Sequence, residues 1–353
     1  MRLLTINPGS TSTKIAVFDD MTPVFSSNIS HSVADLEPFE LVSDQFDFRR
    51  DLILDELARN GIPFRFDAIV ARGGLLKPVE GGVYAVNDVM LSEIEHPMRN
   101  HACNLGCRIA ADFAARLPGC RALTADPGVV DELDDAARIS GSPLLPRIST
   151  WHALNQRAIA RRYAREHGTT YEALNLIVAH LGGGISLGAH RHGRCVDVNN
   201  AFDGEGPFSP ERAGSLPPGA LIDLCFSGRY TREQLKRRIS GNAGLAAHLG
   251  CTDVRAIVEA IEAGDRKAEL VVDGMIHSIA KWIGGAAAVL RGRVDAILLT
   301  GGVAYSDYVV GRLRDYISFI APIHVYPGEN EMLALAANGL AALRGEQEIR
   351  EYR

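Results

Sequence analysis

The sequence predicts an α/β protein built from a duplicated domain. Residues 3–6 and 13–18 have the apolar pattern of a β-hairpin around a turn of small polar residues. Residues 176–180 and 185–189 repeat this pattern far along the chain, around a turn of three glycines. A pattern used twice at so long a spacing indicates two related domains rather than a solenoid of short repeats. Other apolar strands end directly in glycine and lead into helical patterns, which is typical of open α/β sheets.

Both hairpin tips have the composition of a phosphate-binding turn. The first tip runs from Asn7 to Ser12, and Lys14 follows it on the return strand. In the second tip, His180 precedes the glycines, which leave backbone N–H groups open and can adopt the positive φ of tight turns. Two ordinary hairpins with Gly- and Ser-rich turns are the alternative, but Lys14 and His180 favour phosphate. Two such turns facing each other would hold a polyphosphate.

Three further strands end where ligands approach open α/β sheets. Arg72 follows an apolar strand and precedes two glycines, so we expect it to face a ligand rather than solvent. Asp126 follows the next strand, and either caps a following helix or lies in a cleft. Gly301 and Gly302 end a third strand before a predicted helix, where a flat backbone admits a purine ring and a helix N-terminus attracts anions.

Three more side chains are candidates for ligand binding. His152 lies in the first turn of a predicted helix, where it either faces a ligand or is packed. Arg212 lies in a long irregular stretch and is the obvious anion ligand there; a salt bridge to Glu205 or Glu211 is its alternative. Glu331 near the start of the last predicted helix is either a cap residue favoured by the helix dipole or a carboxylate facing a metal.

Composition excludes several classes of protein. The net charge is −6 and no basic block occurs, which argues against nucleic acid as the main partner. No apolar run reaches about 18 residues, so we expect no membrane span. The first residues lack the apolar core of a signal peptide, so we expect a cytoplasmic protein. Of six cysteines only Cys103 and Cys107 lie close in sequence, which favours reduced thiols over a zinc site.

Taken in order, these residues resemble the acetate/butyrate kinase family, within the actin–sugar kinase–chaperone ATPase superfamily. The matching positions are Asn7 to Lys14, Arg72 to Gly74, Asp126, His152, His180 to Gly184, Arg212, Thr300 to Gly302 and Glu331. Length and the two tips are more similar to the butyrate branch than to the acetate branch, which carries Asn where Gly183 stands. The resemblance implies an actin-like ATPase fold with two lobes, a five-stranded mixed sheet in each, and ATP in the cleft between them. The implied lobes are 1–148 with the returning segment 332–353, and 149–331.

The resemblance also implies the reaction, which is reversible transfer of the γ-phosphoryl group of ATP to a short-chain carboxylate such as butyrate or isobutyrate. It implies that Arg72 and Arg212 offset the charge of the reacting anions and that His152 and His180 donate to the phosphoryl group. Asp126 would orient a metal-bound water or an arginine. The residues expected to hold phosphate oxygens are Ser10, Ser12, Lys14, Gly182, Gly183 and Gly184. Asn7 and Glu331 would place Mg²⁺, usually through water, and Gly301 and Gly302 would line the adenosine site of ATP or ADP.

Two other functions stay open at this point. An acetate or propionate kinase differs only in the volume of its acyl pocket, and each methylene contributes only about 1–3 kcal/mol of discrimination. A non-catalytic nucleotide-binding module would share the fold, but it does not need the pair Arg72 and Arg212. The family resemblance also suggests a homodimer or higher oligomer, with the predicted helix around Gly284 and Gly285 as one candidate contact.

Overall fold

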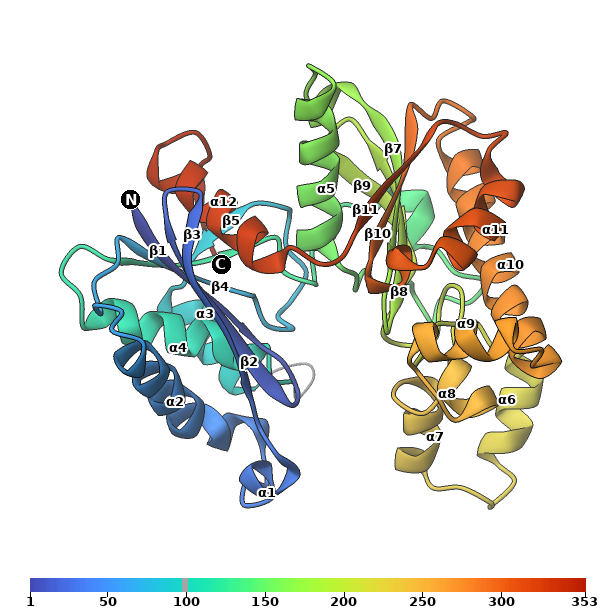
Figure 1. The fold of residues 1–353 in the computed structure, drawn as a ribbon, viewed down its shortest axis with the longest axis horizontal. Helices are drawn as coiled ribbons and strands as arrows, with labels where there is room; N and C mark the ends of the chain where they lie inside the picture. Colours follow the sequence, from blue (N-terminus) through green and yellow to red (C-terminus); the bar gives the residue numbers. More distant parts are fainter. Residues whose placement is uncertain (97–100) are drawn as a thin grey trace. The chain divides into compact units, whose positions relative to one another are not determined.

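We describe residues 1–96 and 101–353 in a computed structural model of the chain (Figure 1). These residues form two compact units. Unit 1 comprises Met1–Val130 and Asn330–Arg353, and unit 2 comprises Asp131–Glu329. Each unit is built around one mixed β-sheet.

The elements of unit 1 include strands and helices, and the last two come from the C-terminal segment. They are β1 (Arg2–Pro8), β2 (Ser12–Asp19), β3 (Thr22–Ser30), α1 (Val33–Leu36), η1 (Val42–Gln45), α2 (Phe46–Arg59), β4 (Ala68–Ala71), β5 (Val83–Ala85), α3 (Asp88–Glu95), α4 (Asn104–Ala115), β6 (Arg121–Ala125), α12 (Glu331–Leu343) and β12 (Ile349–Glu351). Their seven strands have the order β12-β5-β6-β4-β1-β2-β3.

Strand direction in this sheet brings three predicted site residues to one edge. Strands β1, β4 and β6 run parallel, so their carboxyl ends lie on the same side of the sheet. Asn7 lies at the end of β1, Arg72 directly follows β4, and Asp126 directly follows β6. Helices α2 and α4 pack on one face of this sheet and α12 packs on the other (Figure 1).

The elements of unit 2 begin with a short 3-10 helix and include an inserted set of helices. They are η2 (Asp135–Arg138), α5 (Ala153–Glu166), η3 (Tyr171–Ala173), β7 (Asn175–Leu181), β8 (Ile185–Arg191), β9 (Arg194–Val198), α6 (Pro218–Cys225), α7 (Arg232–Ile239), α8 (Gly244–Leu249), α9 (Val254–Glu262), α10 (Arg266–Val289), β10 (Ala296–Gly301), η4 (Gly302–Tyr305), α11 (Asp307–Ile317) and β11 (Ile323–Pro327). Helices α10 and α11 pack on one face of the sheet and α5 packs on the other (Figure 1).

The two sheets confirm the predicted duplication. In unit 2 the order is β11-β10-β7-β8-β9, with β7, β8 and β9 antiparallel and with β10 and β11 parallel to β7. The five strands β6-β4-β1-β2-β3 of unit 1 have the same order and the same directions. The expectation of five strands in each unit is wrong for unit 1, because β5 and β12 extend its sheet at one edge.

The segment 131–148 belongs with unit 2, whereas the sequence places it in the first lobe. Polar contacts hold this segment to the second sheet. Arg147 pairs with Asp197 at 2.9 Å and with Glu205 at 2.6 Å, and the backbone N–H of Asp134 donates to Val196 at 2.9 Å. Such contacts between distant residues leave no local pattern in the sequence.

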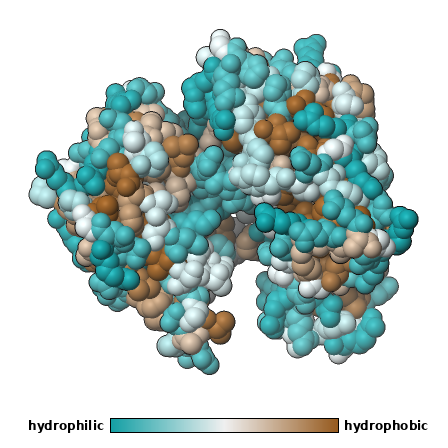
Figure 2. Space-filling model, in the orientation of Figure 1, coloured by the Kyte–Doolittle hydropathy of each residue, from teal (hydrophilic) through white to brown (hydrophobic). Residues whose placement is uncertain are grey.

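Hydrophobic side chains on the face shown in Figure 2 form separate patches among hydrophilic ones. Within the described ranges, no helix combines the length and the apolar character that crossing a membrane requires.

Candidate functional site

Three predicted residues of unit 1 meet at the edge of its sheet. Asn7 donates its side-chain N–H to a carboxylate oxygen of Glu331, which opens helix α12. Arg72 places Nη1 3.2 Å from the same carboxylate and 3.5 Å from Oδ1 of Asn7. Glu331 is buried, and Arg72 is about one-third exposed. The structure thus brings an amide, a carboxylate and a guanidinium together from chain segments that are far apart in sequence.

Asp126 does not cap a helix, so that reading of the sequence is wrong. Residues 127–134 contain no helix. Oδ1 of Asp126 instead accepts from the backbone N–H of Gly82 at 2.9 Å, and the side chain is fully buried. The residue has φ of 40°, which is unusual for a side chain other than glycine and marks a constrained position at the end of β6.

The turn between β1 and β2 is held from behind by Arg49 of helix α2. This fully buried guanidinium donates to the carbonyl oxygens of Gly9 at 2.8 Å, Ser12 at 3.1 Å and Ser10 at 3.1 Å. It also donates to the hydroxyl of Thr13 at 3.0 Å. Because the carbonyls are engaged by one cation behind the turn, the turn offers its donors and a positive field to an anion. Ser10 and Lys14 are exposed, and Ser12 is half-buried.

Between β7 and β8, Gly182 and Gly184 leave space for neighbouring side chains, and the three glycines of this turn have ordinary backbone angles. None of them has a positive φ, contrary to the prediction. A Cβ at Gly182 would lie 3.0 Å from Nε2 of His180, and a Cβ at Gly184 would lie 2.3 Å from Nη1 of Arg212. The turn closes through a hydrogen bond from Gly182 N–H to the carbonyl of Gly184 at 3.2 Å. His180 and Arg212 therefore lie directly against this backbone.

His152 and His180 form a stacked pair beside the turn. Their ring centroids are 3.8 Å apart with an interplanar angle of 9°. Nδ1 of His180 lies 2.9 Å from Oδ1 of Asn155, so this nitrogen is the donor. Nε2 of His180 is buried and lies 3.0 Å from a carboxylate oxygen of Glu329, but no described residue gives it a well-aligned hydrogen bond. That nitrogen is suited to a ligand oxygen.

Arg212 lies in the irregular segment after β9. Its Nη1 donates to the carbonyl of Ala201, and its guanidinium lies 5.2 Å from the ring centre of Phe202. The predicted alternative partner Glu205 pairs with Arg147 instead. Arg212 is thus placed by backbone and ring contacts, next to Gly184.

A cavity of about 950 Å³ opens beside the glycine turn in unit 2. Its lining includes Gly182, Gly183, the start of helix α9 at 252–255, Gly302 and Tyr305. Gly302 faces open space, because a Cβ there would meet no described atom within 4 Å. Gly301 acts differently: it has φ of 90°, and a Cβ there would lie 2.3 Å from the carbonyl oxygen of Leu181. Gly301 therefore permits close packing of β10 on β7.

Among the residues around the two turns and the cavity, the sequence did not single out Arg49, Glu329 and Arg255. Arg49 looks like any charged residue in a helical pattern, because its carbonyl partners carry no side-chain signal. Asp253 caps α9 by accepting from the backbone N–H of Arg255 at 2.9 Å, which fixes the start of this helix at the cavity.

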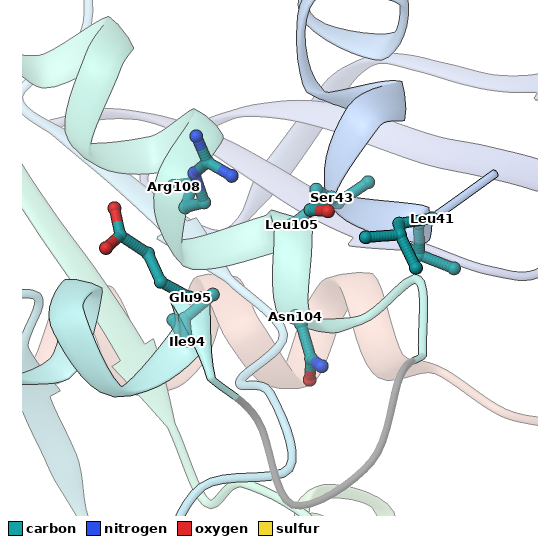
Figure 3. A pocket seen from close by; sticks show the side chains of 8 residues that line it. Leu41, Ser43, Ile94, Glu95, Asn104, Leu105 and Arg108 are labelled. Carbon is teal, nitrogen blue, oxygen red and sulfur yellow. The ribbon is translucent and has the colours of Figure 1, made fainter. Parts of the chain in front are cut away.

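A second, smaller cavity lies in unit 1 and contains none of the predicted residues. It has about 210 Å³ and is lined by side chains from η1, α3 and α4, including Leu41, Ile94, Glu95, Asn104 and Arg108 (Figure 3). Cys103 and Cys107 are buried nearby on the α4 segment, and burial raises the pKa of their thiols to about 11 and 12. No residue set in this cavity suggests a ligand, and among the described residues no cluster of three metal-binding side chains occurs.

Known proteins match the chain along its whole length. The Acetokinase family matches residues 147–320. A protein of Bacteroides thetaiotaomicron named probable butyrate kinase is 64% identical over 353 residues, which is 100% of both chains. Butyrate kinase 1 of Clostridium acetobutylicum is 49% identical over 100% of this chain and 99% of its own. The crystal structure of Porphyromonas gingivalis acetate kinase covers 97% of this chain and 99% of its own, with a TM-score of 0.77 at 19% identity, a likeness that establishes the fold.

Proposed function

Because the chain belongs to the acetokinase family, we propose that it acts as a butyrate kinase, transferring the γ-phosphoryl group of ATP reversibly to butyrate. The chain is 64% and 49% identical over its full length to two proteins named as butyrate kinases, which supports butyrate as the phosphoryl acceptor. The observation that carries the chemistry is the glycine turn with His180 and Arg212 packed against it beside a large cavity.

The residues around this turn fit a phosphate group. Nε2 of His180 is a buried polar atom without a well-aligned partner among the described residues, and it lies beside Gly182. The guanidinium of Arg212 lies over Gly184, and planar guanidinium groups bind phosphoryl oxygens in a two-pronged manner. We assign Gly182, Gly183 and Gly184 to phosphate oxygens and Gly302 to the adenosine end of the cavity.

The proposed reaction needs charge neutralisation more than it needs a base. Butyrate is already ionised at neutral pH, so its carboxylate can attack without losing a proton. Nucleophile and phosphoryl group are both anionic, and positioned cations offset their repulsion. We assign this role to Arg72 and Arg212, and hydrogen-bond donation to His152 and His180. Asp126, held by the backbone N–H of Gly82, would orient a metal-bound water or an arginine.

Asn7 and Glu331 are our candidates for placing Mg²⁺. The side-chain N–H of Asn7, at the end of β1, donates to the carboxylate of Glu331 at the start of α12. Mg²⁺ is usually bound through one or two carboxylates together with phosphate oxygens and water, which one carboxylate and one amide fit. Mg²⁺ would neutralise phosphate charge when bound. Ser10, Ser12 and Lys14 line the other turn and are assigned to phosphate as well.

We propose a cytoplasmic enzyme, because ATP and acyl phosphates are metabolites of that compartment. We also propose a homodimer or higher homo-oligomer, which sedimentation of the purified protein tests directly.

Replacement of the two arginines tests the assignment. Arg72→Ala and Arg212→Ala should each lower kcat for phosphorylation of butyrate by about 10²–10³-fold, because each removes a cation that faces developing charge. Arg59→Ala and Arg266→Ala change exposed helical arginines with local ion pairs and serve as matched controls with unchanged kcat. Circular dichroism establishes that each variant is folded. Near-normal turnover in both Arg72→Ala and Arg212→Ala would overturn the assignment.

A further inference from the structure

A line of buried polar side chains leads from His152 into the interior of unit 2. It runs from His152 to Ser186 of β8, then to Gln156 of α5, His190 of β8 and Tyr171 of η3. Ser186, Gln156 and His190 are fully buried, and Tyr171 is nearly so. Each link is 2.5–2.9 Å long. None of the four residues behind His152 belongs to the site described above.

The amide of Gln156 sets the direction of the hydrogen bonds. Its Nε2 lies 3.1 Å from the carbonyl oxygen of Ser186, and a carbonyl can only accept, so this end of the amide is the donor. Oε1 therefore accepts from Nε2 of His190 at 2.9 Å. His190 carries its proton on Nε2, and its Nδ1 accepts from the hydroxyl of Tyr171 at 2.5 Å.

The orientation of the Ser186 hydroxyl determines which nitrogen of His152 accepts a hydrogen bond. Oγ of Ser186 accepts from Nε2 of Gln156 at 2.8 Å and from the backbone N–H of His152 at 3.4 Å. A hydroxyl has two lone pairs and one proton, so the proton of Ser186 points at Nδ1 of His152, 2.9 Å away. We propose that the line from Tyr171 to Ser186 holds His152 as the neutral tautomer with its proton on Nε2.

Two further features keep the line intact. Burial, aided by the charge of Arg157, lowers the pKa of His190 to about 3, so this ring stays neutral and cannot donate from both nitrogens. Gly188 of β8 leaves the space for the central contact. A Cβ at this position would lie 2.5 Å from Oε1 of Gln156 and 2.7 Å from Nε2 of His190, although the backbone angles of Gly188 are ordinary.

A neutral His152 is compatible with its stacking on His180. Two positively charged rings at a centroid distance of 3.8 Å would repel each other, whereas a neutral ring adds no such repulsion. His152 then brings a neutral N–H donor to the phosphoryl group. This use of the proton rests on the proposed function, but the location of the proton does not.

The location of the proton can be measured without any substrate. Long-range ¹H–¹⁵N correlation spectra of the ¹⁵N-histidine-labelled protein distinguish the two tautomers and the charged ring. The signals of His152 are assigned by their loss in His152→Gln. We expect a protonated Nε2 and a bare Nδ1 near neutral pH. A proton on Nδ1, or on both nitrogens, would overturn this inference and leave the kinase proposal standing.

Gln156→Glu tests the control of the tautomer, because Glu has the same shape and no donor. The proton of Ser186 should turn to the new carboxylate, and the proton of His152 should move to Nδ1. We expect kcat to fall about tenfold or more while KM for ATP changes little, because a misplaced donor mainly reduces stabilisation of the transition state.

His167→Gln, at the end of α5 and outside the line, is the matched control with unchanged kinetics. An unchanged tautomer, or an unchanged kcat after the tautomer has moved, in folded Gln156→Glu protein contradicts the inference. If this variant does not fold, the spectrum of the unmodified protein still decides.

Discussion

Gly183 and Gly184 are neighbours in one turn, yet a methyl group would meet very different surroundings at the two positions. At Gly184 it would lie 2.3 Å from Nη1 of Arg212 and 2.4 Å from Cζ of the same group. At Gly183 its nearest atom would be the carboxylate end of Glu211 at 3.1 Å, which can move aside. The two glycines therefore form a matched pair for testing whether Arg212 must lie against the turn.

Gly184→Ala should displace Arg212 and lower kcat with butyrate by about tenfold or more, because catalytic groups tolerate little misplacement. Gly183→Ala should keep most of the activity, because only the movable carboxylate end of Glu211 lies near the new methyl group. Steady-state kinetics of the two variants make the comparison. Equal losses in both, or none in Gly184→Ala, would show that the position of Arg212 does not depend on this turn.

Arg49 should matter for ATP binding although it lies behind the first turn. Arg49→Met leaves the carbonyls of residues 9, 10 and 12 without their donor and removes a cation beneath the turn. We expect Kd for an ATP analogue to rise about tenfold and the free energy of unfolding to fall by about 1–3 kcal/mol, as for other unpartnered buried groups. Arg59→Met, which changes an exposed arginine of the same helix, should alter neither. Isothermal titration with an ATP analogue and urea unfolding measure the two effects.

The sequence identified the strand-end residues and the two turns, because glycine, arginine and histidine after apolar runs are strong local signals. It could not identify Arg49, whose function depends on backbone carbonyls of another segment. It also explained the second turn by its backbone angles, whereas the reason is the space that His180 and Arg212 occupy. Which atoms surround a glycine depends on tertiary contacts that no local pattern records.

Helices α12 and α10 both contain glycines, but only the glycine of α12 lies in a close packing contact. In α12, a Cβ at Gly339 would lie 2.4 Å from Cγ2 of Val70 and 3.1 Å from Leu3, so this glycine lets the helix lie close on the first sheet. In α10, a Cβ at Gly284 or Gly285 would meet no atom within 4 Å among the described residues. The sequence suggested a close helix contact at that pair, and the described residues of one chain do not supply it.

Gly339→Ala should therefore lower the free energy of unfolding by about 1–3 kcal/mol through overpacking. Gly284→Ala should raise it by about 0.5–1 kcal/mol, because alanine favours the helical state. Urea unfolding of the two variants provides the comparison. Destabilisation by Gly284→Ala, together with a change in sedimentation, would instead indicate that a second copy of the chain packs on this helix.

Most strands of both sheets follow from the sequence, since they are continuous apolar runs that end in glycine or a polar residue. The short strands β5 and β12 do not follow from it. Each has three residues, and they pair with each other across most of the chain length. The sequence also did not predict that the segment 131–148 belongs to unit 2. This assignment likewise depends on contacts between distant residues, here ion pairs with β9 and with the segment after it.

The whole molecule should lose stability in mild acid, and unit 2 offers a clear readout. His190 has its pKa lowered from 6.5 to about 3, chiefly by burial. Below about pH 6.5 the unfolded chain therefore binds a proton at this residue while the folded chain does not. Between about pH 6.5 and pH 3, each unit by which the pH falls lowers the free energy of unfolding by up to about 1.4 kcal/mol. Above pH 6.5 this loss is absent, because His190 is neutral in both states. Both tryptophans, Trp151 and Trp282, lie in unit 2 and report its unfolding.

Urea unfolding followed by tryptophan fluorescence at pH 7 and pH 5 measures this decline. His190→Gln should reduce the difference between the two pH values, because glutamine does not titrate. His192→Gln, which changes an exposed histidine two residues away, should leave the difference as it is. An equal pH dependence in His190→Gln and the unmodified protein would contradict a neutral, buried His190.

We infer that this molecule phosphorylates a four-carbon carboxylate. Acyl-phosphate formation from ATP and Mg²⁺, trapped with hydroxylamine, tests this with acetate, propionate, butyrate and isobutyrate in parallel. We expect product with a maximum at four carbons. A maximum at acetate or propionate would contradict the choice of substrate and keep the mechanism. Absence of product with every acid, from protein that still binds ATP, would contradict the mechanism itself and indicate a non-catalytic nucleotide-binding protein.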